Sequence, residues 1–92
     1  MKFITTFAIR PGALRAAVKQ YMAGMAAPAP GVTLHGRWHK IDMTGGFSLY
    51  ETDDPEALYL TLSRWAELLD FTISPVVDDS VAAPMLIAQY KD

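Results

Sequence analysis

The sequence predicts a single α+β domain in which two helices lie against one side of a four-stranded sheet. Four segments alternate between apolar and polar residues, which is typical of strands, and two segments between them have the apolar spacing of helices. Residues 1–92 make one domain, because chains divide into domains at roughly 100–200 residues each. The sequence is 51% hydrophobic, which is enough for a core and too much for a disordered chain.

The first strand and the first helix are predicted from contrasting spacings. Lys2–Ile9 alternates and is rich in Phe, Ile and Thr, and Pro11 and Gly12 end this strand. Helical spacing of i, i+3, i+4, i+7, i+8 and i+11 follows. The residues in these positions are Leu14, Ala17, Val18, Tyr21, Met22 and Met25. The Pro-rich run 26–31 then ends the helix.

Residues 32–41 predict a second strand, whose alternation defines two faces. One face carries Val32, Leu34, Gly36 and Trp38, and the other carries Thr33, His35, Arg37 and His39. A glycine-containing turn over 42–46 leads into a third strand over 47–52. With a turn of either two or four residues, Arg37 and His39 share a face with Ser48 and Tyr50.

We expect Arg37, His39 and Tyr50 to point away from the helices, while Trp38 and Leu49 pack beneath them. Trp38 continues the apolar set of its face. Burying an unpaired arginine costs several kcal/mol, whereas exposing Trp38 loses about 3 kcal/mol or less. The larger penalty favours the register with Trp38 inside.

The second half of the chain predicts a helix, a strand and a terminal helix. Asp54 is the expected N-cap, with Pro55 in the first helical position. This helix should reach about residue 70. Its apolar side is formed by Leu58, Leu62, Trp65, Ala66 and Leu69. Residues 71–77 predict a strand at an edge or beside a bulge, because it contains Pro75. A short helix over 81–90 should be kinked or begin late at Pro84.

The resulting β-α-β-β-α-β order is that of the ferredoxin-like fold. Right-handed crossovers place both main helices on one face of the antiparallel sheet. The opposite face is a mixture of polar and apolar residues with no cover within the chain. A domain of this size has a thin stability margin, so we expect a second copy to cover that face in a two-fold homodimer.

Several stretches also resemble a known family. In order, they are Met1-Lys2-Phe3, Arg10-Pro11-Gly12, Gly36-Arg37-Trp38-His39, Gly45-Gly46-Phe47, Glu51-Thr52-Asp53-Asp54-Pro55 and Thr72-Ile73-Ser74-Pro75-Val76. Over residues 1–79 the sequence is similar to the bacterial proteins grouped as domain of unknown function 3303. The resemblance implies a dimeric α+β barrel, in which two sheets face each other around a cavity. That wider group includes cofactor-free monooxygenases, haem-degrading enzymes, isomerases and stress-induced proteins, but the family brings no catalytic residues to transfer.

Charge and composition argue against several kinds of partner. Eight Lys and Arg against ten Asp and Glu give a net charge of -2, which does not favour nucleic acid. The chain has no cysteine. His35 and His39 lie four residues apart on one strand, so their Cα atoms are separated by about 13 Å, too far for one metal ion. We therefore expect no metal, no cofactor and no nucleic-acid partner.

The location of the protein is also predicted from the sequence. No apolar run approaches the roughly 20 residues that span a bilayer, and the N-terminal residues lack the pattern of a signal peptide. We expect a cytoplasmic protein without a membrane partner.

The candidate site consists of His39, Arg37, Tyr50 and Ser48, with His35 on the same predicted face. Histidine can accept a proton near neutral pH, arginine can hold an anion, and Tyr and Ser can orient a hydroxyl or an oxyanion. The leading hypothesis is a homodimer that binds a small, largely apolar molecule in a cavity on the uncovered sheet face. One alternative is a cofactor-independent monooxygenase or isomerase with His39 as base. The other is a purely structural dimerisation domain.

Overall fold

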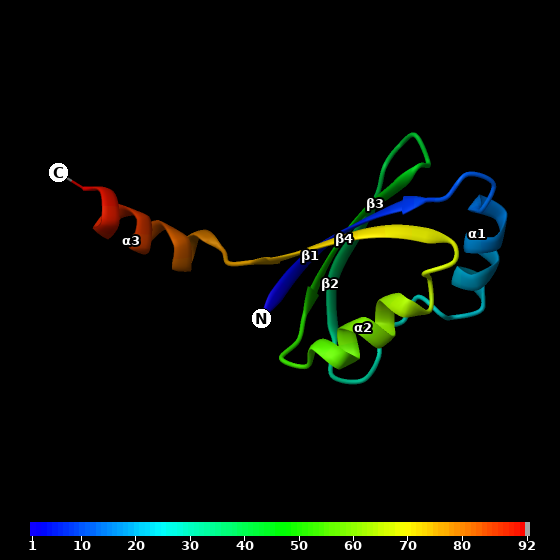
Figure 1. Ribbon diagram of the computed structural model, residues 1–92, viewed down its shortest axis with the longest axis horizontal. Helices are drawn as coiled ribbons and strands as arrows, with labels where there is room; N and C mark the ends of the chain where they lie inside the picture. Colours follow the sequence, from blue (N-terminus) through cyan, green and yellow to red (C-terminus); the bar gives the residue numbers. More distant parts are fainter. Residues whose placement is uncertain (92) are drawn as a thin grey trace.

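The computed structural model describes residues 1–91 and confirms the predicted β-α-β-β-α-β order with a C-terminal helix (Figure 1). Its elements are β1 (Lys2–Ile9), α1 (Leu14–Met22), β2 (Thr33–His39), β3 (Gly45–Glu51), α2 (Pro55–Ser63), β4 (Leu69–Val76) and α3 (Asp79–Tyr90). The strands form one antiparallel sheet in the order β2-β3-β1-β4. Helices α1 and α2 lie on the same side of this sheet, and side chains of both helices line a cavity there. The ferredoxin-like arrangement is therefore present.

The core occupies one end of the space between α2 and the sheet. It is a cluster of buried side chains packed against partly buried Phe3, Leu34 and Phe71. The members of the cluster are Val32, Tyr50, Ala57, Leu58 and Leu62. Their burial fixes α2 over β2 and β3, because the removal of apolar surface from water is the main driving force for such contacts.

The Pro-rich connection after α1 is held to α2 and β3 by two threonines. The Thr61 hydroxyl accepts a hydrogen bond from the Ala29 amide at 3.0 Å, and the Thr52 hydroxyl donates to the Gly31 carbonyl at 2.8 Å. Both threonines are buried. These bonds satisfy backbone groups of a segment that has no regular structure, and they fix the course of the chain as it approaches the cavity.

Helix α2 is shorter than the sequence indicated. It ends at Ser63, and the backbone amides of Trp65 and Ala66 donate to carbonyls three residues earlier, in tight turns. Strand β4 consequently begins at Leu69 rather than at Phe71. The apolar spacing continues past the end of the helix because Trp65 and Leu69 still face the interior of the molecule.

Strand β2 contains a β-bulge at His35. Leu34 lies opposite Tyr50 and Gly36 lies opposite the next residue, Leu49, so that His35 is an extra residue in β2. One extra residue exchanges the two faces for everything that follows it in the strand. Val32 and Leu34 thus lie under the helices as expected, but regular alternation does not continue to Trp38.

The predicted orientation of the site residues is therefore wrong. Arg37, His39 and Tyr50 face the helices, whereas Trp38 and Leu49 lie on the opposite side of the sheet. Trp38 is 58% exposed, and its ring covers Gly36. The parity argument itself is confirmed, because Arg37 is paired with Ser48 in the register and hydrogen-bonds Tyr50 on the same face.

Helix α3 begins at Asp79 and continues through Pro84, so of the two outcomes expected at this proline, a kink or a late start, the late start is wrong. Pro84 is the sixth residue of the helix, where its missing amide removes one hydrogen bond to the carbonyl four residues earlier. The helix projects beyond the end of β4 and away from the rest of the fold (Figure 1). None of its residues is buried. Within residues 1–91, no helix has both the length and the apolarity needed to cross a bilayer.

Replacement of the α2 N-cap should destabilise the fold. Asp54 Oδ1 accepts hydrogen bonds from the amides of Glu56 at 3.0 Å and Ala57 at 3.3 Å. We expect Asp54→Ala to lower the free energy of unfolding by about 0.5–2 kcal/mol, as measured by urea denaturation. Asp53→Ala is the matched control, because within residues 1–91 its fully exposed carboxylate pairs only with the N-terminal amine and should matter less. Equal losses in the two variants would contradict this assignment of the cap.

Candidate ligand-binding site

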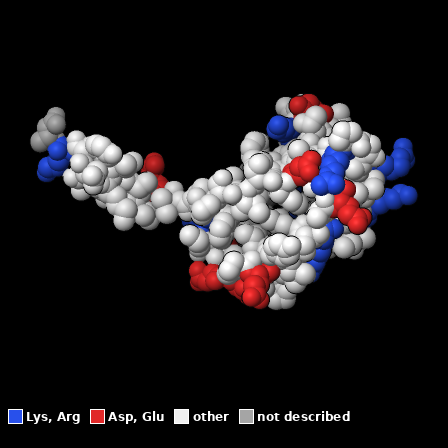
Figure 2. Space-filling view, viewed as in Figure 1, with Lys and Arg blue, Asp and Glu red and all other residues white. Residues whose placement is uncertain are grey.

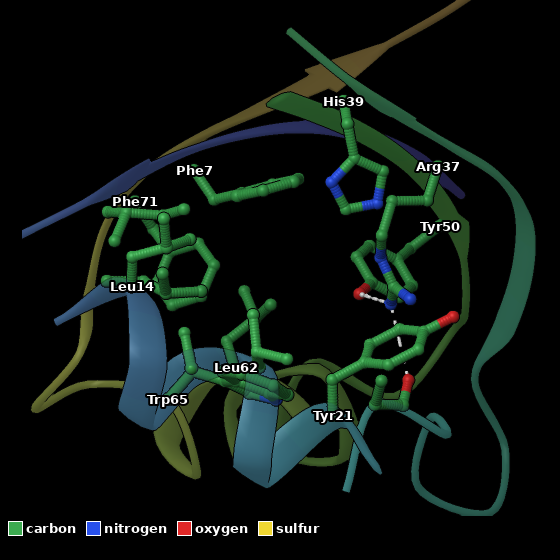
Figure 3. A pocket seen from close by; sticks show the side chains of 14 residues that line it. Phe7, Leu14, Tyr21, Arg37, His39, Tyr50, Leu62, Trp65 and Phe71 are labelled. Atoms are coloured by element: carbon green, nitrogen blue, oxygen red, sulfur yellow. Dashed lines mark hydrogen bonds between the residues drawn. The ribbon is translucent and has the colours of Figure 1, made fainter. Parts of the chain in front are cut away.

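A cavity of about 360 Å³ lies between α1, the end of α2 and the helix-facing side of the sheet (Figure 3). Most of its wall is apolar. Aromatic rings are contributed by Phe7, Tyr21, Trp65 and Phe71, and smaller side chains by Leu14, Ala17, Val18 and Leu62. At one end the wall becomes polar, where Arg37, His39 and Tyr50 come together. The cavity is thus an unfilled space next to the packed core, on the same side of the sheet.

The apolar stripe of α1 faces this cavity. Leu14, Ala17, Val18 and Tyr21 all line it, which confirms most of the predicted helical face. Met22 instead lies at the end of the helix with 79% of its surface exposed. Leu14, Val18 and Tyr21 also remain partly exposed, because the helix borders a hollow rather than a filled core. This helix therefore forms the side of the site that is open to solvent.

Gly46 allows two rings of the cavity wall to meet. It lies between His39 of β2 and Phe7 of β1 in the same row of the sheet. A Cβ at Gly46 would lie 2.0 Å from the Trp38 carbonyl oxygen and 2.7 Å from the Phe7 ring. Without a side chain there, the rings of Phe7 and His39 approach edge to face, with centroids 5.6 Å apart and planes at 75°. The sequence indicated only a turn at this glycine.

Arg37 is the charged group of the cavity. Its Nη2 donates to the Ala26 carbonyl and to the Tyr50 hydroxyl, both at 3.2 Å. No Asp or Glu lines the cavity, and among residues 1–91 no carboxylate forms an ion pair with Arg37. The Nε and Nη1 atoms of Arg37 make no hydrogen bond to any group of residues 1–91. The guanidinium group therefore has further donors available for an anion or another acceptor.

Tyr50 and His39 complete the polar end of the cavity at different depths. Tyr50 is only 4% exposed, and because its hydroxyl accepts from Arg37, the hydroxyl proton can be donated to a third group. His39 is exposed and lies nearer the surface. A ligand oxygen at this end would meet a buried hydroxyl, a guanidinium group and an imidazole.

The other two candidate residues are not part of this wall. Ser48 is buried beside Arg37 but does not line the cavity. His35 lies at the bulge, where its Nε2 is 2.7 Å from Glu51 Oε1. This hydrogen bond holds the pKa of the Glu51 carboxyl below its ordinary value. Three of the five predicted residues, Arg37, His39 and Tyr50, are thus brought together.

The aromatic wall is the part of the site that the sequence did not indicate. Phe7 and Phe71 are directly paired across β1 and β4, and Trp65 follows α2 with its Nε1 donating to the Met25 carbonyl at 3.3 Å. The available signal was the alternation of Phe3, Thr5 and Phe7, which places both Phe residues on the helix side. Within residues 1–91, no group of three potential ligand residues is arranged to hold a metal ion.

Solved structures with a similar fold include the following three. A proposed antibiotic biosynthesis monooxygenase from Deinococcus radiodurans is 14% identical, with a TM-score of 0.49 over 85% of this chain and 94% of the other. A proposed monooxygenase from Shewanella loihica PV-4 is 16% identical, with a TM-score of 0.45 over 84% and 93% of the two chains. Rv0793 from Mycobacterium tuberculosis is 17% identical, with a TM-score of 0.44 over 84% and 94%.

No curated protein matches the sequence. At the level of sequence families, the match extends over residues 1–90, which is nearly the whole chain and includes every element of the fold described above. The chain therefore belongs to the family described as domain of unknown function DUF3303.

Proposed function

We propose that this protein binds a small, largely apolar organic anion in the cavity between the helices and the sheet. The observation that carries the proposal is Arg37, a guanidinium group without a carboxylate partner among residues 1–91, in a cavity walled by aromatic and aliphatic side chains. This cavity lies on the helix side of the sheet, whereas the sequence favoured a pocket on the opposite, uncovered face.

The shape and the chemistry of the cavity support this class of ligand. Its volume of about 360 Å³ lies within the range of roughly 300–1,000 Å³ found for ligand pockets. Phe7, Phe71 and Trp65 offer ring faces and edges to an aromatic or alicyclic body. A carboxylate, sulfonate or phenolate of the ligand would accept hydrogen bonds from Arg37 and Tyr50, which offsets the cost of leaving a charge in an apolar site.

The assembly that we propose is a homodimer formed through the open face, the side of the sheet turned away from α1 and α2. At its centre are Ile4, Thr6, Trp38, Phe47, Leu49 and Thr72. Trp38 and Phe47 are opposite one another in the register and are 58% and 44% exposed. A paired, exposed Trp and Phe on a sheet face are typical of an interface.

A second candidate function is cofactor-independent catalysis with His39 as general base. It is favoured by the presence of His39 in the same cavity as Arg37 and Tyr50. A carbon acid bound there would lose a proton to His39, while its enolate oxygen would accept hydrogen bonds from Arg37 and Tyr50. This is a working arrangement for an isomerase, or for the first step of an oxygenase.

Removal of the guanidinium group should weaken the binding of anions selectively. We expect Arg37→Met to reduce the affinity for 1-anilinonaphthalene-8-sulfonate about tenfold or more, because a hydrogen bond to a charged group contributes about 1.5–3 kcal/mol. The neutral N-phenyl-1-naphthylamine has the same ring system and should change by less than about twofold, since it lacks the sulfonate. Fluorescence titration measures both affinities.

Arg15→Met is the matched control for this experiment. Arg15 is exposed on α1, does not line the cavity, and should leave both affinities unchanged. Equal weakening of the charged and the neutral probe by Arg37→Met would show that the variant damages the cavity rather than anion recognition. Unchanged sulfonate binding would overturn the role of Arg37.

Filling the cavity should weaken binding without unfolding the protein. Ala17 is buried and lines the cavity, so we expect Ala17→Leu to weaken both naphthyl probes about tenfold or more. Ala16→Leu adds the same atoms one residue earlier, at an exposed position outside the cavity. If both variants bind the probes as the parent protein does, the probes occupy another surface.

The catalytic candidate predicts isotope exchange. In D2O, the protein should accelerate exchange of the C1 protons of 2-tetralone, an apolar ketone, as followed by proton NMR. His39→Gln should reduce the accelerated rate by about 10²-fold or more while retaining binding of the naphthyl probes, because general base catalysis typically contributes 10²–10⁴-fold. Acceleration that persists in the variant would exclude His39 as the base.

A further inference from the structure

Helix α3 has no buried residue although most of its side chains are apolar. Of residues 81–90, Gln89 and Tyr90 are the two whose side chains carry a polar group, and no residue of the helix is buried. Met85, Leu86, Ile87 and Tyr90 are all more than half exposed. Figure 2 shows this helix as an extension with very little charge between its two ends.

A helix with this composition is found in the interior of an assembly. Apolar residues on a single stripe would suit a helix that lies on a surface, but residues that are apolar all round require cover on more than one side. In water, α3 by itself would also be only marginally helical, because it has 12 residues and isolated helices become stable only beyond about 12–15 residues. Its structure therefore requires a partner.

The connection to β4 directs α3 away from its own sheet. Only Val77 and Asp78 separate the two elements, and Asp78 is extended, with φ -86° and ψ 177°. Lys2 Nζ lies 3.7 Å from Asp78 Oδ2, which ties the connection to the beginning of β1. The Asp78 carboxylate also accepts from the Ser80 hydroxyl at the start of the helix. This path carries α3 off the end of the sheet rather than back over it (Figure 1).

We propose that α3 is an arm that packs against a second copy of this chain, as part of the same interface as the open face. The inference rests on the proposed homodimer and adds the element that completes it. In a two-fold dimer each copy would extend its arm over the other, so that the exchange buries two helices at once.

The available apolar area supports a second copy as the occupant. A covered aromatic side chain buries about 150–250 Å², so Trp38 and Phe47 of the open face, exposed to 58% and 44%, could together bury about 150–260 Å². A stable interface needs about 800 Å² from each partner. The two aromatic side chains of the open face therefore reach only part of this area. The large apolar side chains of α3, Val81, Met85, Leu86 and Ile87, supply much of the remainder.

Truncation and charge substitution test the arm. The full chain should behave as a dimer in light scattering, at twice 10.1 kDa. A chain ending at Val77, or the double variant Leu86→Glu and Ile87→Glu, should dimerise at least tenfold more weakly. Gln89→Glu is the control on the same helix and should dimerise as the parent does. Since α3 has no buried residue, these changes should leave the domain folded, which circular dichroism can confirm.

Emission of Trp38 reports the covered face directly. In a Trp65→Phe background, Trp38 is the remaining tryptophan, and its emission should shift to the red when the dimer is diluted or the arm removed. Isotope-filtered NOEs in a mixture of labelled and unlabelled chains should connect the methyl groups of Leu86 and Ile87 with protons of the other copy.

The outcomes separate the arm from the dimer. If the truncated chain dimerises as tightly as the full chain and no such NOEs appear, the arm proposal fails while the homodimer stands. If the full chain is monomeric at every concentration, both fail, and protection of α3 from proteolysis then indicates that it folds back on its own domain. A monomer with α3 accessible to protease indicates a partner of another kind.

Discussion

The bulge at His35 determines what each side of the sheet presents. At the start of β2, Val32 and Leu34 must lie under α2, because they complete the core with Tyr50. In a regular strand this parity would continue and bring Trp38 into the space beneath α1. One extra residue reverses it, so that Arg37 and His39 enter the cavity while Trp38 lies on the open face. The polar end of the cavity and the aromatic centre of the open face both depend on this residue.

The helix side of the sheet tolerates Arg37 because it is filled at one end and hollow at the other. Near α2, apolar side chains exclude water, and a guanidinium group there would be costly. Near α1 the wall is open, and the Ala26 carbonyl and the Tyr50 hydroxyl accept hydrogen bonds from Arg37. Ala26 belongs to the Pro-rich connection that Thr61 and Thr52 hold in place. The polar site is thus supported by backbone contacts that lie outside the sheet.

Local rules were enough to predict the fold and not enough to predict the faces. Asp54 and Pro55 marked the start of α2, and the hairpin parity correctly grouped Arg37 and His39 with Ser48 and Tyr50. The predicted orientation of Arg37 and Trp38 was wrong for two reasons. It assumed regular alternation across His35, and it compared the burial of Arg37 in a filled core with the exposure of Trp38 to solvent. A bulge is stabilised by the pairing of two strands, so it leaves little trace in the residues of one. A hollow lined by both apolar and polar groups is likewise a property of assembled elements.

Trp38 and Arg37 are neighbours in the chain, yet they serve the two sides of one strand. Under the proposed assembly, cover over Trp38 would restrain β2, an edge strand that within residues 1–91 pairs only with β3. The same strand holds Arg37 and His39 at the polar end of the cavity, where small displacements change hydrogen-bond geometry. A second copy would therefore stiffen the ligand site without contacting the ligand. A domain this small has a thin stability margin, so β2 would gain rigidity from a second copy. That gain is a physical reason for the dimer interface and the ligand site to lie on the two sides of the same strand.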